Sequence, residues 1–589
     1  MSRKLLRILF LTGLTLFINA CDGTTKTDVP PPTVFVEQST ADEITPSVMM
    51  TEEVPESQLI GTPRTFSPAP GGGLTSDNND LFAAAGICVT CHQNNLDEAG
   101  NDVSNGEYWR STMMANAAKD PYYLAGVSIN IARYPKFGLA IEAKCSTCHM
   151  PMAHFSDTAQ GQQGLIFGED GYLDPQHPLH RLASDGVSCT TCHQIQDEGL
   201  GGFTSFSGGG VFDTQTPMGT RLLFGPFVTQ QSGQNIMSGS SGFIPVQGNH
   251  LVQSELCATC HNLYTHFVTK NGTFGEDWFP EQTPYSEWLN SDYATLSACQ
   301  DCHMPPAEGA VVLSNRGPAI LRSPYAKHNF VGGNVYMLDL LKNFGGELGV
   351  QAGPEHFDAT NARTMTQLQS QSAALAITDP VQADKLLSFD VTTNILTGHK
   401  FPAGYPSRRV WLHITVKDIT GQIIFESGSV SSNGAISGND NDADTLAFEP
   451  HYDQITSPEQ VQIYEAIMQD VYGKVTTVLL SASAYSKDNR LLPAGFAKTA
   501  VTTDIAPKGK ALTDDDFIGG EDTVTYRVDT GNTTGPFTVE AELLYQSIAY
   551  RWALDVSAYD SATVQAFSDY YSSLPNLPIV ITAQSAETK

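Results

Sequence analysis

The pentapeptide CSTCH, residues 145–149, places two cysteines three positions apart and a histidine directly after the second cysteine. The same arrangement recurs as CVTCH at 88–92, CTTCH at 189–193, CATCH at 257–261 and CQDCH at 299–303. Together the five copies use ten of the eleven cysteines in the chain. Composition alone would not produce such repetition, and C-x-x-C-H is the attachment sequence of c-type haem. The repeat therefore predicts five covalently bound haem c groups.

Each part of the motif has a chemical task. The two thiols bond to one haem, and the following histidine binds the iron as its proximal ligand. Structural zinc also uses Cys-x-x-Cys pairs, but it does not require a histidine after every second cysteine. The predicted haem-binding residues, with the five histidines as proximal ligands, are Cys88, Cys91, His92, Cys145, Cys148, His149, Cys189, Cys192, His193, Cys257, Cys260, His261, Cys299, Cys302 and His303.

A haem iron has a second axial position, and ten of the fifteen histidines lie outside the motifs. The candidates for distal ligands are His154, His177, His180, His250 and His328, with His266 and His356 as weaker ones. Because His154 follows His149 by only five residues, we expect it to bind the iron of a neighbouring haem. Met113 or Met114 could also serve, although ordinary core packing is favoured for both. The alternative for each histidine is a surface or core position without a ligand role.

The N-terminus predicts export and lipid attachment. MSRKLLR is basic, ILFLTGLTLF is apolar, and INAC resembles a bacterial lipobox, so residues 1–20 read as a lipoprotein signal peptide and Cys21 as the lipidated residue. An ordinary signal peptide with a chance cysteine is the alternative. Residues 21–75 are rich in Pro, Ser, Thr and acidic residues and predict a disordered stalk. We therefore expect a protein anchored to the outer membrane by its lipid only, facing the periplasm or the cell surface.

The remaining chain divides into two parts with different patterns. Residues 76–380 carry all five motifs between short helices and loops, and 359–377 predicts a longer helix. Residues 381–589 alternate apolar and polar positions, which predicts antiparallel strands. The predicted fold class is a multidomain α+β protein, in which a mostly helical pentahaem domain precedes an antiparallel β-sandwich. The segments predicted as strands are 387–395, 409–418, 422–430, 474–485, 522–529 and 537–548.

The predicted β-sandwich has candidate sites of its own. Asp440, Asp442 and Asp444 alternate and could wrap oxygens around Ca²⁺, with Glu449 or Asp453 as further donors. The segment lacks the central glycine of an EF-hand loop, and a solvated acidic turn is the alternative reading. His399, in TGHKFPAGYP, could be an axial ligand, a propionate partner or a structural turn residue.

The chain is strongly acidic, with 32 basic and 63 acidic side chains and a formal net charge of −31 at pH 7. This balance argues against nucleic acid as a partner and against electrostatic binding to anionic lipid. It leaves cationic or neutral partners, or an acidic surface that only keeps the protein soluble.

Several stretches, in this order, resemble the bacterial multihaem cytochromes c: EYWRSTMMANAAKDPYY, HPLHRLASDGVSCTTCHQI, SELCATCHNLYT, EWLNSDYATLSACQDCHMP and KHNFVGGNVYM. These proteins are kin to the tetrahaem cytochromes of nitrifiers, and more distantly to ammonia-forming nitrite reductase and hydroxylamine oxidoreductase. TGHKFPAGYPSRRVWLHI and QVQIYEAIMQD resemble the β-domain that many of them carry, and the resemblance covers most of residues 85–500.

The resemblance implies bis-histidine haems and electron transfer, with His328, His177, His180 and His154 at positions that usually supply distal ligands. The chain departs from the two catalytic relatives. All five motifs end in histidine, whereas ammonia-forming nitrite reductase typically has a lysine-ligated haem, and nothing resembles the tyrosine cross-link of hydroxylamine oxidoreductase.

We therefore expect a protein that passes electrons along five haems in respiratory or extracellular electron transfer. Its partners would be redox proteins or an external acceptor, and assembly into a homo-oligomer or filament stays open. The alternative is an oxidoreductase with one open haem that converts a small nitrogen or sulfur species.

Overall fold

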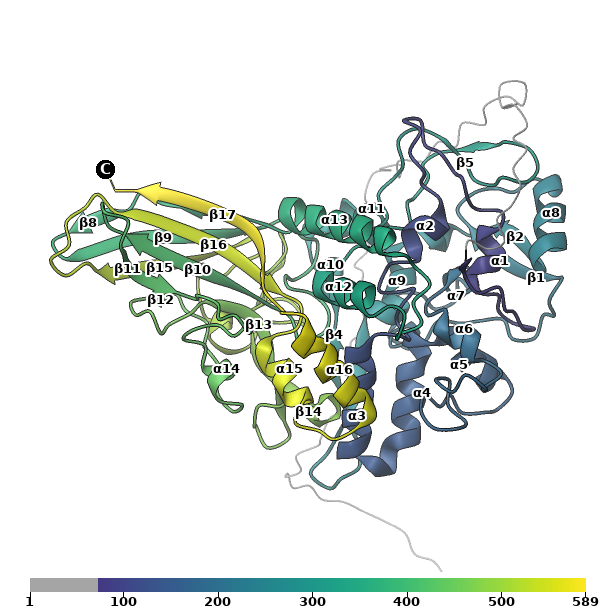
Figure 1. The fold of residues 1–589 in the computed structure, drawn as a ribbon, viewed down its shortest axis with the longest axis horizontal. Helices are drawn as coiled ribbons and strands as arrows, with labels where there is room; N and C mark the ends of the chain where they lie inside the picture. The colour runs from purple at the N-terminus through teal and green to yellow at the C-terminus, as the bar shows by residue number, and fades with distance from the viewer. Residues whose placement is uncertain (1–72, 589) are drawn as a thin grey trace, which may run out of the picture. The chain divides into compact units, whose positions relative to one another are not determined.

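The predicted haem motifs lie at the ends of helices in the computed structural model, which describes residues 73–588. The described residues fall within one structural unit, residues 54–589. The predicted signal peptide, Cys21 and all of the predicted stalk except residues 73–75 lie outside the described part of the chain. Helices predominate before residue 372 and strands after it, so the fold is mixed α and β (Figure 1).

Five helices carry the motifs: α1 (Ala85–Val89), α4 (Gly138–His149), α7 (Cys189–Cys192), α9 (Ser254–His261) and α11 (Cys299–His303). The prediction of short helices that begin or end at the motifs is therefore confirmed.

The other helices surround these five or lie in the strand-rich part. They are α2 (Asn105–Trp109), α3 (Pro121–Arg133), α5 (Pro151–Ala159), α6 (His180–Ser184), α8 (Gln231–Ser241), α10 (Pro284–Leu289), α12 (Val335–Asn343), α13 (Pro354–Gln371), α14 (Asp440–Ala443), α15 (Tyr550–Val556) and α16 (Ala562–Ser573).

The strands form two larger sheets and three two-stranded ones within the described residues. They are β1 (Arg221–Gly225), β2 (Phe243–Gln247), β3 (Leu263–Val268), β4 (Phe274–Gln282), β5 (Val311–Val312), β6 (Leu321–Arg322), β7 (Ala373–Ile377), β8 (Val381–Ala383), β9 (Leu386–Ile395), β10 (Arg409–Lys417), β11 (Ile423–Ser427), β12 (Gln454–Ile455), β13 (Ile463–Asp470), β14 (Ala482–Asp488), β15 (Glu521–Asp529), β16 (Thr538–Gln546) and β17 (Ile579–Glu587).

The two larger sheets share one apolar core. One sheet has the order β14-β13-β10-β16-β17 with β11 beside β10, and the other has β12-β15-β9-β7 with β8 beside β9. Alternate residues of β9 and β15, such as Phe389 and Val524, are buried together with Leu412 of β10 and Val539 of β16. Alternation of this kind is what a strand with one buried face requires. Nearly all of these pairings are antiparallel, but β12 runs parallel to β15.

Most predicted strands are present, and one predicted helix is shorter than expected. The strands predicted at 387–395, 409–418, 422–430, 522–529 and 537–548 correspond to β9, β10, β11, β15 and β16, whereas in 474–485 only the last residues belong to a strand, β14. The helix predicted at 359–377 ends at Gln371, and its last five residues form β7. Ala373 and Leu375 are buried while their neighbours are exposed, so this segment follows the two-residue period and pairs with β9.

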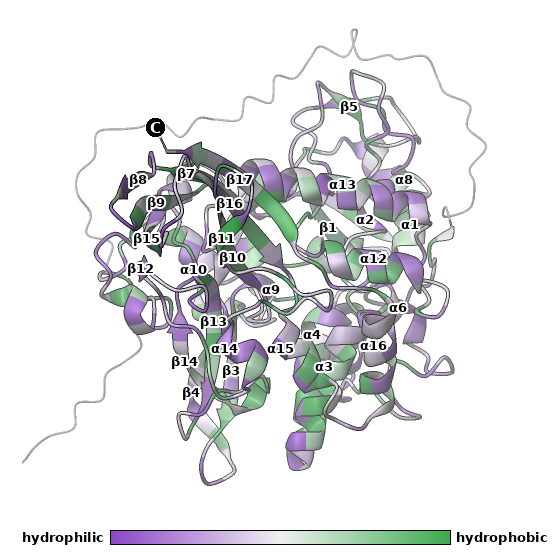
Figure 2. Cartoon of the chain, turned by 60° about the vertical axis from the view of Figure 1, so that its left-hand side comes forward, coloured by the Kyte–Doolittle hydropathy of each residue, from purple (hydrophilic) through white to green (hydrophobic). Residues whose placement is uncertain are grey.

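The C-terminal helices were not expected from the sequence, and they pack on the helical part. α16 begins at its cap residue Ser561, whose hydroxyl accepts a hydrogen bond from the Val564 backbone N–H at 3.2 Å. It lies against α3, where the rings of Tyr122 and Phe567 have centroids 5.2 Å apart. In Figure 2 much of α3 has the colour of hydrophobic residues, in keeping with a helix that is covered by a neighbour. No helix in the described residues is long and apolar enough to cross a membrane.

Candidate haem-binding sites

In four motifs both cysteines lie within one helix and therefore on one side of it, whereas α1 ends at Val89, between Cys88 and Cys91 of the first motif. Residues three and four apart lie on the same helix face, so both thiols and the following histidine project together. All ten motif cysteines are partly buried and none forms a disulfide. Among the described residues, no group of three potential metal ligands within 4.8 Å of one another includes a motif cysteine. The thiols are therefore not gathered around one point, as structural zinc requires, and they fit attachment to a macrocycle instead.

Four of the five motif histidines have the same hydrogen bond at Nδ1. The acceptors are the backbone oxygens of Leu313 for His92 at 2.9 Å, Ala117 for His149 at 3.2 Å, Phe224 for His193 at 2.6 Å and Val331 for His303 at 2.7 Å. A carbonyl can only accept, so each ring carries its proton on Nδ1 and leaves the lone pair of Nε2 free for a metal. His261 differs, because its side chain is exposed and no hydrogen bond to its ring is found in the described residues.

Burial keeps these imidazoles neutral. It lowers the pKa of His149 to about 4, and burial together with the neighbouring His399 lowers the pKa of His303 to about 4. A metal-bound imidazole must be unprotonated, so histidines of this kind are ready to bind iron at neutral pH.

The motifs meet one another in space through their thiols. A neighbouring thiol, together with burial, raises the pKa of one cysteine in each of three pairs: Cys88 beside Cys189, Cys148 beside Cys260, and Cys257 beside Cys299. These three pairs link the first motif to the third, the second to the fourth, and the fourth to the fifth. In addition to burial, Cys260 raises the pKa of Cys192, and Cys192 raises that of Cys257. The third motif therefore lies beside the fourth.

The motif histidines indicate the same neighbouring motifs as the thiols do. The pKa of His193, lowered chiefly by burial, is lowered further by His92; that of His149 is lowered further by His261; and that of His303 also responds to His261. Thiols and imidazoles therefore give one consistent arrangement, in which the motif at 257–261 has three neighbours.

Two histidines outside the motifs face motif histidines. The ring of His328 lies 6.4 Å from that of His193, centroid to centroid, with 15° between the planes. The ring of His399 lies 6.2 Å from that of His303, with 14° between the planes. With metal–nitrogen bonds of about 2 Å, two imidazoles on opposite sides of one metal have centroids about 6 Å apart. Both pairs therefore match the spacing of two axial ligands.

His328 and His399 also have the required tautomer. Nδ1 of His328 donates to the Ala326 oxygen at 3.2 Å, and Nδ1 of His399 donates to the Lys400 oxygen at 2.9 Å. Burial lowers the pKa of His328 to about 3. Both side chains thus resemble the motif histidines in leaving Nε2 free.

The two histidines of HPLH differ from each other. Nδ1 of His180 donates to the Tyr172 oxygen at 2.8 Å, which leaves Nε2 free. Nδ1 of His177 instead accepts from the Leu179 backbone N–H at 3.1 Å, so Nε2 of the neutral ring carries the proton. Only His180 has the tautomer that the motif histidines share.

The two ring nitrogens of His154 both lie beside hydroxyl groups. Nδ1 is 3.0 Å from the Ser146 hydroxyl, and Nε2 is 3.2 Å from the Thr147 hydroxyl. These contacts hold the ring against the helix of its own motif, and neither nitrogen is free. Ligation of a neighbouring iron by His154 stays a prediction from the sequence.

The remaining candidates lie in other settings. Nε2 of His250 donates to the Ile195 oxygen at 2.9 Å, which leaves Nδ1 as its free nitrogen. The ring of His266 stacks on Trp278 at 3.5 Å, and Nε2 of His356 bonds to Glu107 at 2.7 Å. Met113 packs against the core around α3 and α16.

A buried network of charges, which was not predicted from the sequence, holds the segment that carries His399. Nζ of Lys400 bonds to Asp488 at 2.7 Å, and Arg490 bonds to Asp488 at 2.9 Å and to Glu287 of α10 at 2.9 Å. Burial alone would raise the pKa of Asp488, but Arg490 and Lys400 hold it well below its ordinary value. The network fixes the residue that follows His399, since Glu287 also accepts from the Lys400 backbone N–H at 3.2 Å.

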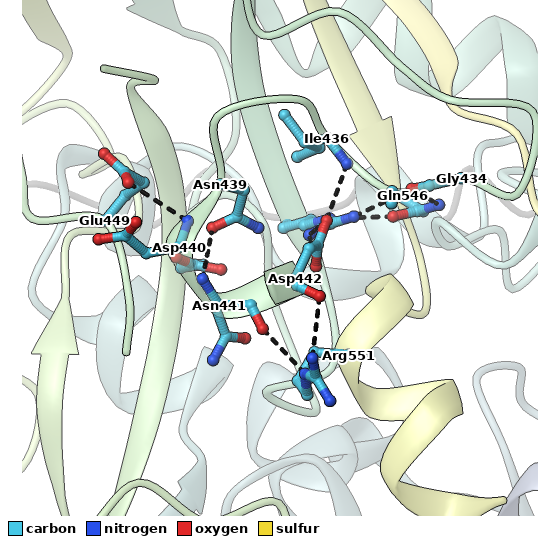
Figure 3. A network of polar contacts seen from close by, with 12 residues as sticks. Gly434, Ile436, Asn439, Asp440, Asn441, Asp442, Glu449, Gln546 and Arg551 are labelled. Atoms are coloured by element: carbon cyan, nitrogen blue, oxygen red, sulfur yellow. Dashed lines mark hydrogen bonds and ion pairs between the residues drawn. The ribbon is translucent and has the colours of Figure 1, made fainter. Parts of the chain in front are cut away.

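The predicted calcium residues are engaged elsewhere. Arg409 bonds to both oxygens of Asp442, at 2.8 and 3.0 Å, and the Ile436 backbone N–H donates to one of them at 2.8 Å (Figure 3). Asp440, Asp442 and Asp444 are not among the sets of three ligands that lie within 4.8 Å of one another in the described residues. The charge of Asp442 is balanced by the buried Arg409, and calcium binding by the three carboxylates stays a prediction from the sequence.

A search of protein-family models finds no match for the chain, and neither does a search of curated proteins. Among solved structures, the chain is similar to a penta-heme cytochrome c552 from Thermochromatium tepidum. The identity is 14%, the match covers 88% of this chain and 100% of the other, and the TM-score is 0.48. At this level the likeness does not establish a shared fold.

Proposed function

We propose that this chain is a c-type cytochrome that binds five haems covalently and transfers electrons between them. The observation that carries the proposal is the proximity of all five C-x-x-C-H motifs, whose thiols and histidines lie near enough to shift the pKa values of their neighbours. When bound, the haems supply the one-electron chemistry, and the protein supplies attachment, axial ligands and burial.

The contacts between motifs support an order for the haems. The path runs from the motif at 88–92 to that at 189–193 and then to that at 257–261. From there it branches to the motifs at 145–149 and 299–303. The motif at 257–261 would be the junction that joins the motifs at 145–149 and 299–303 to each other and to the pair at 88–92 and 189–193.

The ring geometry supports two distal ligands. His328 would be the second axial ligand of the iron bound by His193, and His399 would be that of the iron bound by His303. The tautomer of His180 suits it to a third iron, and His250 could bind only through Nδ1. Six-coordinate irons favour electron transfer over binding of a small molecule.

The cellular setting follows from the sequence expectations. The protein would be exported, anchored to the outer membrane through Cys21, and would exchange electrons with redox proteins or an external acceptor, in respiratory or extracellular electron transfer. Cys21 lies outside the described residues.

Haem counting and spin state test this proposal. The purified protein should contain five haems by pyridine haemochrome assay, and its ferric irons should be low-spin in electron paramagnetic resonance. His399→Ala and His328→Ala should each convert one haem in five to high spin without loss of attached haem, because the thioether bonds remain.

His413→Ala is the matched control, since His413 is a partly exposed histidine of β10 bonded to Glu426 and Glu542. It should leave every haem low-spin. Fewer than five attached haems, or no change of spin state in the first two variants, would contradict the assignment. A high-spin haem in the unmodified protein that binds added ligands would favour the alternative, an oxidoreductase acting on a small nitrogen or sulfur species.

A further inference from the structure

Three carboxylates converge at the edge of the five-stranded sheet, far in sequence from the haem motifs. Asp514 and Asp516 lie in the loop that precedes β15, and Asp453 lies just before β12, the strand paired with β15. One oxygen from each carboxylate lies within 4.8 Å of the other two. Asp453 and Asp516 are exposed while Asp514 is half-buried, so the group opens to solvent on one side.

A fourth carboxylate lies behind these three and lacks a partner for one oxygen. Asp522 of β15 is fully buried. Its Oδ2 accepts from the Tyr464 hydroxyl at 2.6 Å and from Gln462 at 3.3 Å, but Oδ1 makes no hydrogen bond in the described part of the chain. Oδ1 lies on the side of Asp514, since both carboxylates approach Nε2 of His451, at 3.7 and 3.1 Å. A buried carboxylate oxygen left without a partner is costly, and a cation on this side would satisfy it.

The histidine beside the carboxylates is a hydrogen-bond donor and not a metal ligand. Nδ1 of His451 accepts from the side-chain amides of Gln462 at 2.9 Å and Asn489 at 3.1 Å. Each amide is oriented by a backbone N–H that donates to its oxygen, that of Tyr452 for Gln462 and that of Glu465 for Asn489. Because Nδ1 must accept, Nε2 carries the proton and donates to Asp514. The ligands on offer are therefore oxygens alone.

We propose that Asp453, Asp514 and Asp516 bind a calcium ion, with the buried carboxylate of Asp522 behind it. Oxygen-only sites select hard cations over zinc or copper. Calcium accepts six to eight oxygens in irregular geometry and suits exposed carboxylates completed by water, whereas magnesium demands a near-ideal octahedron.

The surrounding charges leave room for a cation. The ammonium group of Lys498 is directed to backbone oxygens of the same loop, those of Ala511, Asp514 and Phe517. It holds the loop closed and does not pair with the three carboxylates.

A bound calcium ion would tie three segments together: the start of β12, the loop before β15, and β15 itself. We expect binding to the folded protein alone, so that calcium raises the thermal stability of the strand-rich part by mass action. An affinity on the order of 0.1–1 mM is typical of extracellular calcium modules.

The test is isothermal titration of the full-length holoprotein, treated with EDTA and dialysed, with calcium chloride. We expect one site per chain, and a rise in unfolding temperature on adding calcium. Asp516→Asn and Asp453→Asn should each weaken binding about tenfold or more. The matched control is Asp515→Asn, which removes the same charge from an exposed position of the same loop and should change the affinity less than about twofold.

Two results would overturn the proposal. One is the absence of calcium binding at millimolar concentrations. The other is an equal loss of affinity in Asp515→Asn and Asp516→Asn, which would mean that calcium only screens an acidic surface. Neither result bears on haem content, which is measured separately in the same preparations.

Discussion

The backbone group that bonds to Nδ1 determines whether Nε2 of a histidine is free to bind a metal. Where a carbonyl accepts from Nδ1, as at His180, the ring presents a free Nε2, and where a backbone N–H donates to Nδ1, as at His177, it does not. The two residues are three positions apart and indistinguishable as candidates in the sequence. Their difference arises from the turn that surrounds them. The turn places the backbone oxygen of Tyr172 beside the His180 ring and the Leu179 N–H beside the His177 ring.

Glu281 of β4 is a buried acid near the second haem motif, and its titration should be visible in stability. Its carboxylate contributes to the raised pKa values of Cys145 and Cys148. The Thr265 hydroxyl donates a hydrogen bond to it at 2.6 Å. Burial raises its pKa from the ordinary 4.5 to about 7. A raised folded-state pKa contributes stability that is complete below pH 4.5 and is lost as the pH rises through 7.

Glu281→Gln should therefore raise the free energy of unfolding at pH 8 by up to about 3 kcal/mol and change it little at pH 4.5. Urea unfolding at the two pH values measures the difference. Glu276→Gln, an exposed position on the same strand, should have no effect at either pH. An equal gain for Glu281→Gln at both pH values would show that packing, and not ionisation, is responsible.

The elements that meet at the His399 segment are held by charges rather than by apolar contacts alone. Asp488 ends β14, Glu287 belongs to α10, and both are bridged by Arg490. A buried charge that loses its partner destabilises a protein far more than the pair stabilises it. The network thus makes the position of His399 depend on a residue almost ninety positions further along the chain.

Asp488→Asn should lower the free energy of unfolding by about 3–5 kcal/mol, because it leaves Lys400 buried without a countercharge. The pKa of Asp488 is depressed, so its contribution is present above the ordinary value of 3.8 and is lost only as the pH falls below it. The loss should consequently be the same at pH 5 and pH 8. Glu521→Gln, at an exposed position of β15, serves as the control and should cost less than about 0.5 kcal/mol. If Asp488→Asn lowers the free energy of unfolding no more than the control does, the charge network does not stabilise the fold.

Elements with a strong period could be predicted from the sequence, and contacts between them could not. Alternation predicted β9, β10, β15 and β16, which the structure contains. The haem-attachment residues stay a prediction from the motif spacing. The helix expected through residue 377 ended at Gln371 because pairing with β9 outweighed local helix preference. Lys400 gave no signal, since a buried lysine looks like any other until its partner is placed beside it. The same applies to Asp453 and Asp514, which are about sixty residues apart and share a site only after β12 pairs with β15.

At the scale of the whole molecule, the order of the motifs in space differs from their order in the sequence. The thiol of Cys148 in the second motif is influenced by that of Cys260 in the fourth motif, although the third motif lies between them in the sequence. Because the fourth motif lies near three others, the proposed electron exchange between the two branches and the first and third motifs would pass through it.

Removing a haem from the junction should therefore differ from removing one at the end of the path. Replacing Cys257 and Cys260 with alanine should slow the redistribution of electrons among the four remaining haems after flash reduction. Replacing Cys88 and Cys91 should leave redistribution among the other four unchanged, because that motif ends the path. Both variants should hold four haems, and equal kinetics in the two would contradict the proposed branching.

The packing of α16 on α3 has a consequence for how the protein matures. Synthesis runs from the N-terminus, so α3 exists long before the residues that cover it. Until residues 562–573 arrive, Tyr122 and its apolar neighbours lack their cover. If the motifs receive haem as proposed, we expect a nascent chain to be open on this side while attachment takes place. A chain truncated before α16 should expose the apolar face of α3 and become more sensitive to proteases.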